Sequence, residues 1–145
     1  MYYNEDIGFL IKLVGDTIET TTNQKLKPYD ITLSQGRVLA YLHSRKGLKT
    51  SQKMLEDYFK VTHPTMIGIL KRLIAKELVV SEVDPEDRRI RNIYLNNSKI
   101  KKAKIDRILT HNIQSDLLIG FEDEKIAELK EMLKGILHNI NTNQA

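Results

Sequence analysis

The stretch that decides the fold runs from residue 50 to residue 95 and reads TSQKMLEDYFKVTHPTMIGILKRLIAKELVVSEVDPEDRRIRNIYL. Its first half contains two short amphipathic segments separated near Val61. Pro64 lies in the first turn of the second segment, where a missing N–H costs nothing. Its second half contains two β-rich runs, residues 78–83 and 91–95, joined by a charged turn that begins with Asp84-Pro85. The predicted order is helix, turn, helix, strand, basic turn, strand, which is the order of a winged helix-turn-helix.

The composition limits the classes of protein to which the chain can belong. A length of 145 residues suits one domain, and the net charge of +4 is modest. The charge is uneven, because residues 50–104 carry 12 basic and 7 acidic residues whereas residues 105–145 carry 4 and 7. A cationic middle fits nucleic acid better than an acidic substrate.

The absence of cysteine excludes disulfides, thiolate metal sites and thiol redox sensing. The first residues lack the basic start and apolar core of a signal peptide. No apolar run approaches the length that spans a bilayer. The sequence therefore predicts a soluble cytoplasmic protein.

Helical periodicity extends on both sides of the central stretch. An apolar stripe over residues 7–18 predicts a first helix that fades into the polar run 19–27, and Thr32 with Gln35 predicts a capped second helix that Gly47 ends. After the strands, residues 96–98 are expected to cap one long helix that Gly120 ends. In the last helix the apolar residues alternate at spacings of three and four, which is typical of a helix-pairing seam. The predicted fold is mainly α with a two-stranded β-wing.

The second helix of the central motif is the candidate for the DNA major groove. Helical spacing predicts that this helix buries Met66 or Ile67, Ile69 or Leu70, Leu73 and Ile74. The stripe Ile67, Leu70, Leu73 and Ile74 is assigned to its inward face. The outward face then supplies the candidate contacts Thr62, His63, Pro64, Thr65, Met66, Gly68, Lys71 and Arg72. Its N-terminus attracts phosphate through free N–H groups and the helix dipole. The alternative is an ordinary surface helix in which Thr62 only caps.

Thr50, Ser51 and Gln52 begin the preceding helix and are candidate phosphate contacts, although plain capping explains them equally well. The turn between the strands places Arg88, Arg89 and Arg91 within four residues. Arginine suits narrow minor grooves, where the potential is strongly negative. The alternative for these arginines is a solvated charged turn.

These motifs together resemble the MarR family of bacterial transcription regulators. Three segments carry the resemblance: residues 61–73, Leu78-Val79, and the turn Asp84-Pro85-Glu86-Asp87-Arg88-Arg89. The resemblance covers essentially the whole chain. It implies that Arg89 enters the minor groove and that Asp87 holds the wing in shape. Two residues depart from the family pattern: Glu77, where glycine is frequent, and Asn96, where threonine is usual.

The resemblance also implies a homodimer that reads a palindromic operator. In one domain of residues 1–145, about 30–96 would form the winged core, and about 1–29 and 97–145 would form the dimerisation helices. The implied dimer contacts are Ile7, Leu10, Ile11 and Val14 of the first helix and Ile126, Leu129, Leu133, Ile136 and Ile140 of the last. The implied function is a transcription regulator, in the first place a repressor, whose DNA affinity a small-molecule effector modulates.

Enzymatic function finds little support in the sequence, and we expect no catalytic residue and no cofactor. The four histidines are scattered, and there is no recognisable nucleophile, paired carboxylate or glycine-rich phosphate loop. Two alternatives remain open at this point. One is a winged-helix module that binds another protein and no DNA. The other is a metal-dependent enzyme or sensor with a site such as His111 and Asp116.

Overall fold

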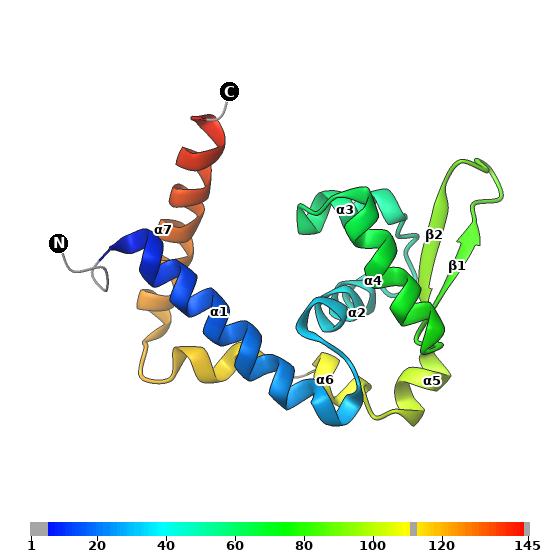
Figure 1. The fold of residues 1–145 in the computed structure, drawn as a ribbon, viewed down its shortest axis with the longest axis horizontal. Helices are drawn as coiled ribbons and strands as arrows, with labels where there is room; N and C mark the ends of the chain where they lie inside the picture. Colours follow the sequence, from blue (N-terminus) through cyan, green and yellow to red (C-terminus); the bar gives the residue numbers. More distant parts are fainter. Residues whose placement is uncertain (1–5, 111–112, 144–145) are drawn as a thin grey trace. The chain divides into compact units, whose positions relative to one another are not determined.

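The computed structural model describes residues 6–110 and 113–143, and their side chains except those of residues 110 and 113–115. The chain divides into two compact units, Met1–His111 and Asn112–Ala145 (Figure 1). The first unit contains α1 (Ile7–Leu26), η2 (Lys27–Tyr29), α2 (Leu33–Ser44), α3 (Gln52–Phe59), α4 (His63–Ala75), β1 (Val79–Val83), β2 (Arg91–Leu95), α5 (Asn97–Lys102) and α6 (Asp106–Thr110). The second contains η3 (Ile113–Leu118) and α7 (Asp123–Thr142). This order confirms the predicted mainly helical fold with a two-stranded wing.

α1 is longer than predicted, because the polar residues after position 18 continue the helix to Leu26. The hydroxyls of Thr20 and Thr21 donate to backbone carbonyls one turn earlier, at 3.0 and 2.8 Å, so the polar side chains are satisfied within the helix. The buried residues of α1 are Thr22 and Leu26, both in this polar half, which contacts α2. The polar end of α1 therefore anchors the helix to the core, and the apolar stripe at its beginning is exposed.

The helices of the winged core begin at predicted caps. Thr32 and Gln35 form the reciprocal capping box of α2, with N–H to side-chain distances of 3.3 and 3.2 Å. Ser51 caps α3 and Thr62 caps α4, each by accepting from the N–H three residues later, at 3.1 and 3.3 Å. Of the residues that begin this segment, Ser51 and not Thr50 is the cap of α3.

The buried face of α4 differs in part from the predicted one. Met66 and Leu73 are fully buried and Leu70 is 3% exposed, whereas Ile67 is half-buried and Ile74 is 42% exposed. The prediction that Ile67 and Ile74 face inward was wrong. Both stripes have helical spacing, so periodicity alone does not choose between them. The neighbours decide, because α2, α3 and β1 all pack against α4.

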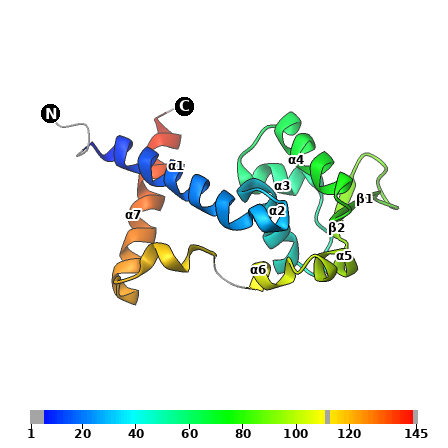
Figure 2. The ribbon, with the colours of Figure 1, turned by 60° about the horizontal axis from the view of Figure 1, so that its bottom comes forward.

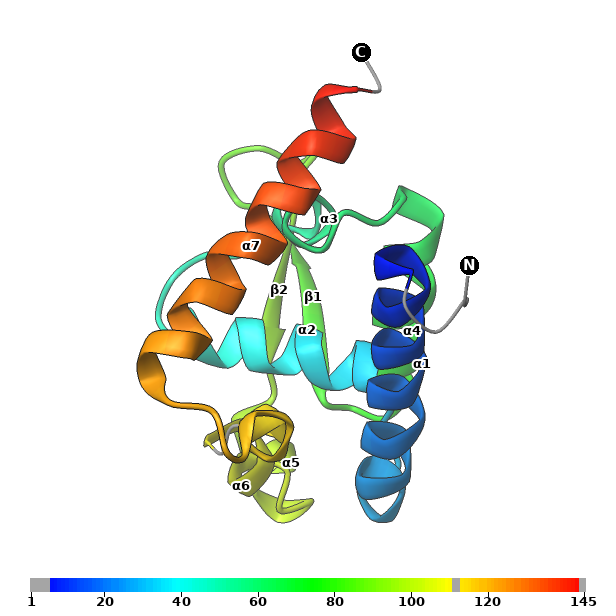
Figure 3. The same ribbon diagram turned by 90° about the vertical axis from the view of Figure 1, so that its left-hand side faces the viewer.

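The wing is an antiparallel pair in which Val79 lies opposite Leu95. Figure 2 shows the two strands projecting from one end of the first unit, beside α4. α2 crosses β2 (Figure 3), and the two elements are in contact. The segment before α3 also joins the sheet, because the N–H of Ile93 donates to the carbonyl of Thr50 at 2.8 Å. These contacts supply the support that an isolated two-stranded ribbon lacks.

Lys76 ties the C-terminal end of α4 to the start of α2. Its ammonium group donates to the side-chain oxygen of Gln35 at 3.0 Å and to the backbone carbonyl of Asp30. Gln35 therefore serves both the capping box of α2 and the end of α4, which holds these two helices in a fixed relation.

The turn from α4 into β1 passes through a left-handed residue that is not glycine. Glu77 has φ +62°, its N–H donates to the carbonyl of Ile74 at 2.8 Å, and the N–H of Leu78 donates to the carbonyl of Leu73 at 3.0 Å. This is a Schellman motif, and Leu73 and Leu78 supply its buried apolar pair. A left-handed cap thus forms where the sequence departs from the usual glycine.

The prediction of one long helix from residues 96–98 to Gly120 was wrong. α5 begins as predicted, because Asn96 accepts from the N–H of Lys99 at 3.3 Å, but it ends at Lys102. Lys104 has φ +62°, and Ile105 donates to the carbonyl of Ile100 at 3.0 Å in a second Schellman motif.

The break in this segment serves the core. Ile100 and Ile105 are 3% and 0% exposed. Residues five apart on a straight helix point about 140° from each other, so an unbroken helix could not bury both. The chain continues as α6 and, after residues 111–112, as the 3-10 helix η3.

Glu77→Gly is expected to raise the free energy of unfolding by about 0.5–1 kcal/mol. Glycine adopts the left-handed conformation without the steric cost that a side chain brings, although it adds some entropy to the unfolded chain. The substitution also removes the ion pair between Glu77 Oε2 and Lys99 Nζ, which are 3.3 Å apart. Because both side chains are largely exposed, this loss lowers the free energy of unfolding only slightly. Chemical denaturation measures the difference.

Glu77→Ala is the matched control, because it removes the same ion pair and keeps a Cβ in the left-handed conformation. We expect no gain in this variant. An equal gain in both variants would show that the carboxylate, and not the backbone, is the source of the strain.

Candidate nucleic-acid interface

The first turn of α4 presents small polar side chains to solvent. Thr62, His63, Pro64 and Thr65 are all exposed. The hydroxyl of Thr62 donates to that of Thr65 at 2.9 Å, which keeps both at the helix end. The positive end of the helix dipole also lies here, so an anion bound at this turn is stabilised.

A largely buried carboxylate lies beneath this turn. Glu56 of α3 has a side chain only 10% exposed, and its Oε2 lies 2.8 Å from Nδ1 of His63 and 3.4 Å from Nε2 of Gln52. The predicted contact residues Gln52 and His63 are thus joined through a residue that was not predicted. Of these two contacts, only the one between Gln52 and Glu56 has a signal in the sequence, which is their spacing of four residues. The contact between Glu56 and His63 joins two helices and has no such signal.

A depression of about 370 Å³ separates α4 from the wing. Its lining comes from α3, α4 and both strands: Gln52, His63, Ile67, Leu70, Lys71, Ile74, Ser81, Arg91 and Ile93. The rim includes two cations, Lys71 of α4 and Arg91 of β2, and Arg91 donates to the hydroxyl of Ser81 at 3.3 Å. The partly exposed Ile67 and Ile74 lie in this depression, which explains why they are not in the core.

A second depression, of about 400 Å³, lies on the α2 side of α4. It is lined by Thr32, Ser34, Gln35, Pro64, Thr65, Gly68, Ile69 and Arg72. A Cβ added at Gly68 would meet only the guanidinium of Arg72, at 3.8 Å, which is ordinary contact. Four of the predicted α4 residues border this depression, and His63 and Lys71 border the other; the four are Pro64, Thr65, Gly68 and Arg72.

The wing tip carries an arginine held by its own neighbour. The carboxylate of Asp87 accepts from Nε and Nη2 of Arg89, at 3.1 and 2.9 Å, and from the backbone N–H of the same residue at 3.0 Å. These bonds hold the pKa of Asp87 below its usual range and raise the pKa of Arg89. The side chain of Arg89 is 90% exposed, so the pair presents the guanidinium in a defined orientation.

The base of the wing turn is organised by Asp84, which is 7% exposed. Its carboxylate accepts from the side chain of Asn92 at 2.8 Å, from the N–H groups of Glu86 and Asp87 at 2.8 and 3.1 Å, and from Lys49 at 3.2 Å. The bond from Asn92, followed by that from Glu86, holds the pKa of Asp84 well below its usual range. Asp84 had been predicted only as a turn residue.

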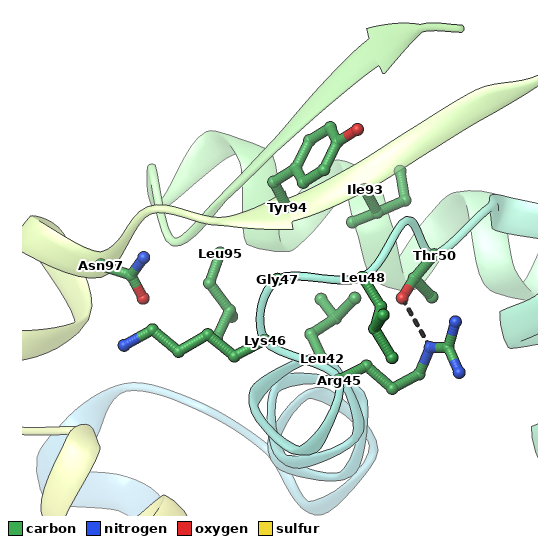
Figure 4. A pocket seen from close by; sticks show the side chains of 10 residues that line it. All are labelled: Leu42, Arg45, Lys46, Gly47, Leu48, Thr50, Ile93, Tyr94, Leu95 and Asn97. Atoms are coloured by element: carbon green, nitrogen blue, oxygen red, sulfur yellow. Dashed lines mark hydrogen bonds between the residues drawn. The ribbon is translucent and has the colours of Figure 1, made fainter.

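Two predicted contact residues are buried and cannot offer their side chains to DNA. Thr50 is 1% exposed, and its hydroxyl accepts from Nε of Arg45 at 2.9 Å (Figure 4). Met66 is 0% exposed and belongs to the core face of α4. Arg45 and strand β2 cover Thr50. Met66 is buried because it lies on the face of α4 that packs against the core. Both positions are removed from the candidate interface.

The residues predicted to form a dimer lie on helices whose apolar faces are uncovered to different degrees. On α1, Ile7, Leu10, Ile11 and Val14 are exposed; on α7, Leu133 and Ile140 are exposed, whereas Ile126, Leu129 and Ile136 are half-buried. No residue of α7 between Asp123 and Thr142 is buried. These placements are compatible with the predicted dimer contacts but do not test them.

Within residues 6–110 and 113–143, no three His, Cys, Asp or Glu side chains come close enough to hold a metal ion. His111, named as a candidate metal ligand with Asp116, lies outside the described residues. None of the described helices combines the length and apolar character needed to cross a membrane.

Comparison with known proteins finds one family and several similar structures. Residues 29–90 match the sequence model of the MarR family. The chain is similar to MepR of S. aureus in a DNA complex (26% identity, TM-score 0.83) and in a DNA-binding conformation (26%, 0.80), with 93% of this chain and 98% of that chain covered in both cases. It is also similar to the transcription regulator MarR from Oenococcus oeni PSU-1 (26%, 0.77, covering 92% of this chain and 99% of that chain). No curated protein matches the chain.

Asp84→Asn is expected to weaken the acid dependence of stability. Because the pKa of Asp84 is lower in the folded protein than in the unfolded chain, its carboxylate stabilises the fold above about pH 4, and this stabilisation is lost as the pH falls below that value. The free energy of unfolding of the natural protein should therefore fall more steeply between about pH 5 and about pH 2 than that of the variant.

Urea denaturation across this pH range measures both slopes. Asp16→Asn, which removes an exposed carboxylate from α1, is the control for the loss of one negative charge. Equal slopes for the natural protein and Asp84→Asn would contradict the assignment of Asp84 as the carboxylate that anchors the wing.

Proposed function

The chain belongs to the MarR family of winged helix-turn-helix proteins, and from this premise we propose that it is a DNA-binding transcription regulator. It acts in the cytoplasm as a homodimer on a palindromic operator. It acts as a repressor, and a small-molecule effector modulates its affinity for DNA. The proposal assigns no catalytic residue.

The observation that carries the proposal is the arrangement of cations around one depression in the first unit. Lys71 of α4 and Arg91 of β2 share the depression between helix and wing, and the exposed first turn of α4 borders it through His63. Residues 50–104 carry 12 basic and 7 acidic residues, so this part of the chain attracts polyanions. The solved DNA complex of MepR, with the same fold, supports a DNA ligand.

We assign separate contacts to the helix and the wing. The first turn of α4 enters the major groove, where short hydroxyls and the histidine reach base edges or phosphates. The proposed contacts of this part are Gln52, Thr62, His63, Pro64, Thr65, Gly68, Lys71 and Arg72, with Ser51 limited to its cap. The wing supplies Arg88, Arg89 and Arg91, of which Arg89 enters the minor groove.

The dimer follows from the apolar faces of the terminal helices. We propose that α1 and α7 bury these faces against a second copy, so that about residues 1–29 and 97–145 form the dimerisation region and about 30–96 form one reader. A two-fold dimer matches a palindrome whose half-sites lie about one helical turn apart. An effector can bind more tightly to a dimer in which the two winged cores have one spacing than to a dimer in which they have another. The operator affinity then changes by the ratio of the effector's affinities for these two conformations of the dimer.

The operator is found by selecting duplexes from a random DNA library with the purified protein. A palindrome with half-sites about one helical turn apart is the expected result. The selected duplex is then titrated at several salt concentrations, where affinity should fall steeply with salt. No enrichment, together with no salt-dependent binding, would favour a protein-interaction module instead.

Arg89→Ala is expected to weaken binding to the selected duplex about tenfold, because a groove contact is lost. Fluorescence anisotropy at fixed salt measures the affinity. The double variant Asp87→Asn with Arg89→Ala separates this loss from repulsion by the newly unpaired Asp87. Lys130→Ala on α7 controls for the loss of one positive charge. Full affinity in the double variant would remove Arg89 from the interface.

The natural protein is expected to have the mass of a dimer in dilute solution. Leu133→Glu, which places a charge at a seam position of α7, should give a monomer. The monomer should bind the duplex more weakly, because a single winged core then contacts one half-site without a linked second copy. Light scattering measures the mass. Lys134→Glu places the same residue one position away and should leave the dimer intact. A monomeric natural protein would refute the dimer.

A further inference from the structure

The strongest unexplained feature is the carboxylate of Glu56 beneath the first turn of α4. Its side chain is 10% exposed, and its nearest partner is Nδ1 of His63 at 2.8 Å. Gln52 lies 3.4 Å from the same carboxylate oxygen and 3.3 Å from the same ring nitrogen. The side chain of His63 is 63% exposed, so one edge of the ring is fixed by α3 and the rest faces solvent.

This geometry favours one of the two tautomers of the neutral ring. An ionised carboxylate has no proton to donate, so the short contact requires a proton on Nδ1 of His63. The amide of Gln52 is also a donor and therefore turns to Glu56 and not to a lone pair on Nδ1. When the ring is neutral, Nε2 then has only a lone pair. Among the residues that the structure describes, nothing donates to or accepts from Nε2.

The consequence for DNA is a matter of hydrogen-bond polarity. A phosphate oxygen only accepts hydrogen bonds, so it repels the lone pair on Nε2 of a neutral His63. The same phosphate accepts a hydrogen bond from Nε2 once the ring has taken up a second proton. The resulting bond is charge-assisted and short.

We infer that Glu56 is a positioning residue that allows His63 to contact a DNA phosphate only as the imidazolium, so that DNA binding takes up a proton at this ring. The inference rests on the proposed DNA-binding function. Glu56 itself stays below the interface and touches no DNA. It acts by deciding which nitrogen of His63 can donate.

Charged groups near the His63 ring come from α3, from α4 itself and from β2. From α3, Glu56 faces the ring, while Lys53 and Asp57 pair with each other at 2.9 Å. Lys71 and Arg91 line the same depression as the ring. The α2 residues that border the first turn of α4 are uncharged: Thr32, Ser34 and Gln35. Lys71 and Arg91 attract the phosphate to the depression that the ring borders.

The first test compares pH profiles of binding to the selected duplex. The natural protein should bind about tenfold more tightly at about pH 6 than at about pH 8, and His63→Gln, which donates at every pH, should show a clearly smaller change. In Glu56→Gln the amide accepts from Nδ1 or donates to it, so the neutral ring can present a proton at Nε2 and the profile should flatten. His138→Gln on α7 should keep the natural profile.

The second test reads the tautomer directly in the free protein. Long-range 1H–15N NMR at about pH 8 should show His63 protonated at Nδ1 in the natural protein and a larger share of the Nε2-protonated form in Glu56→Gln. His63→Gln identifies the signals. This readout would not move if Glu56 served only to stabilise the fold, and thermal melts of each variant confirm that it is folded.

Three results would overturn the inference while leaving the proposed function intact: a profile in Glu56→Gln as steep as the natural one, tighter binding at high pH through the neutral ring, or an Nε2-protonated His63 in the free natural protein. Absence of duplex binding at every pH would instead refute the DNA-binding function, and this inference with it.

Discussion

The wing depends on one carboxylate. Asp84 collects hydrogen bonds from the backbone of the turn that follows it, from Asn92 on the return strand, and from Lys49 in the connection between α2 and α3. A two-stranded ribbon by itself is marginally stable, so its tip is positioned only as well as its base is held. Because the same carboxylate joins the turn, β2 and the helical core, the arginines of the wing have a fixed relation to α4. Every proposed contact that involves helix and wing together relies on this relation.

Burial in the core outweighs local backbone preference at two helix ends. Glu77 and Lys104 both have φ +62°, which costs a residue with a side chain about 1–2 kcal/mol. Each left-handed residue follows a helix whose last turn and next segment both contribute a buried leucine or isoleucine. Burying one such side chain is worth about 1.5–3 kcal/mol, so a pair of them more than offsets the strain. The ends of α4 and α5 are therefore set by what the core must contain.

Local signals in the sequence predicted the parts of the fold that local forces determine. The caps at Thr32 and Thr62, the two strands and the turn between them all form where expected. The register of α4 was predicted wrongly, because Met66 and Ile67 both fit a helical stripe and only neighbouring helices distinguish them. The burial of Thr50 depends on Arg45 and on pairing with β2, neither of which periodicity reveals. For the same reason, the partners of buried carboxylates escaped prediction, since hydrogen bonds between elements leave no regular spacing.

The bond between Asp87 and Arg89 has a consequence for the timing of recognition. A guanidinium paired with a carboxylate has little net charge when seen from beyond the Debye length of about 8 Å, so Arg89 adds little to the long-range attraction of DNA. Within the described residues, Arg88 and Arg91 have no carboxylate partner, and their field reaches further. Long-range charge sets the rate of encounter, and close contacts set the rate of dissociation. In the proposed binding mode, Arg88 and Arg91 therefore govern how often the protein finds DNA, and Arg89 governs how long it stays.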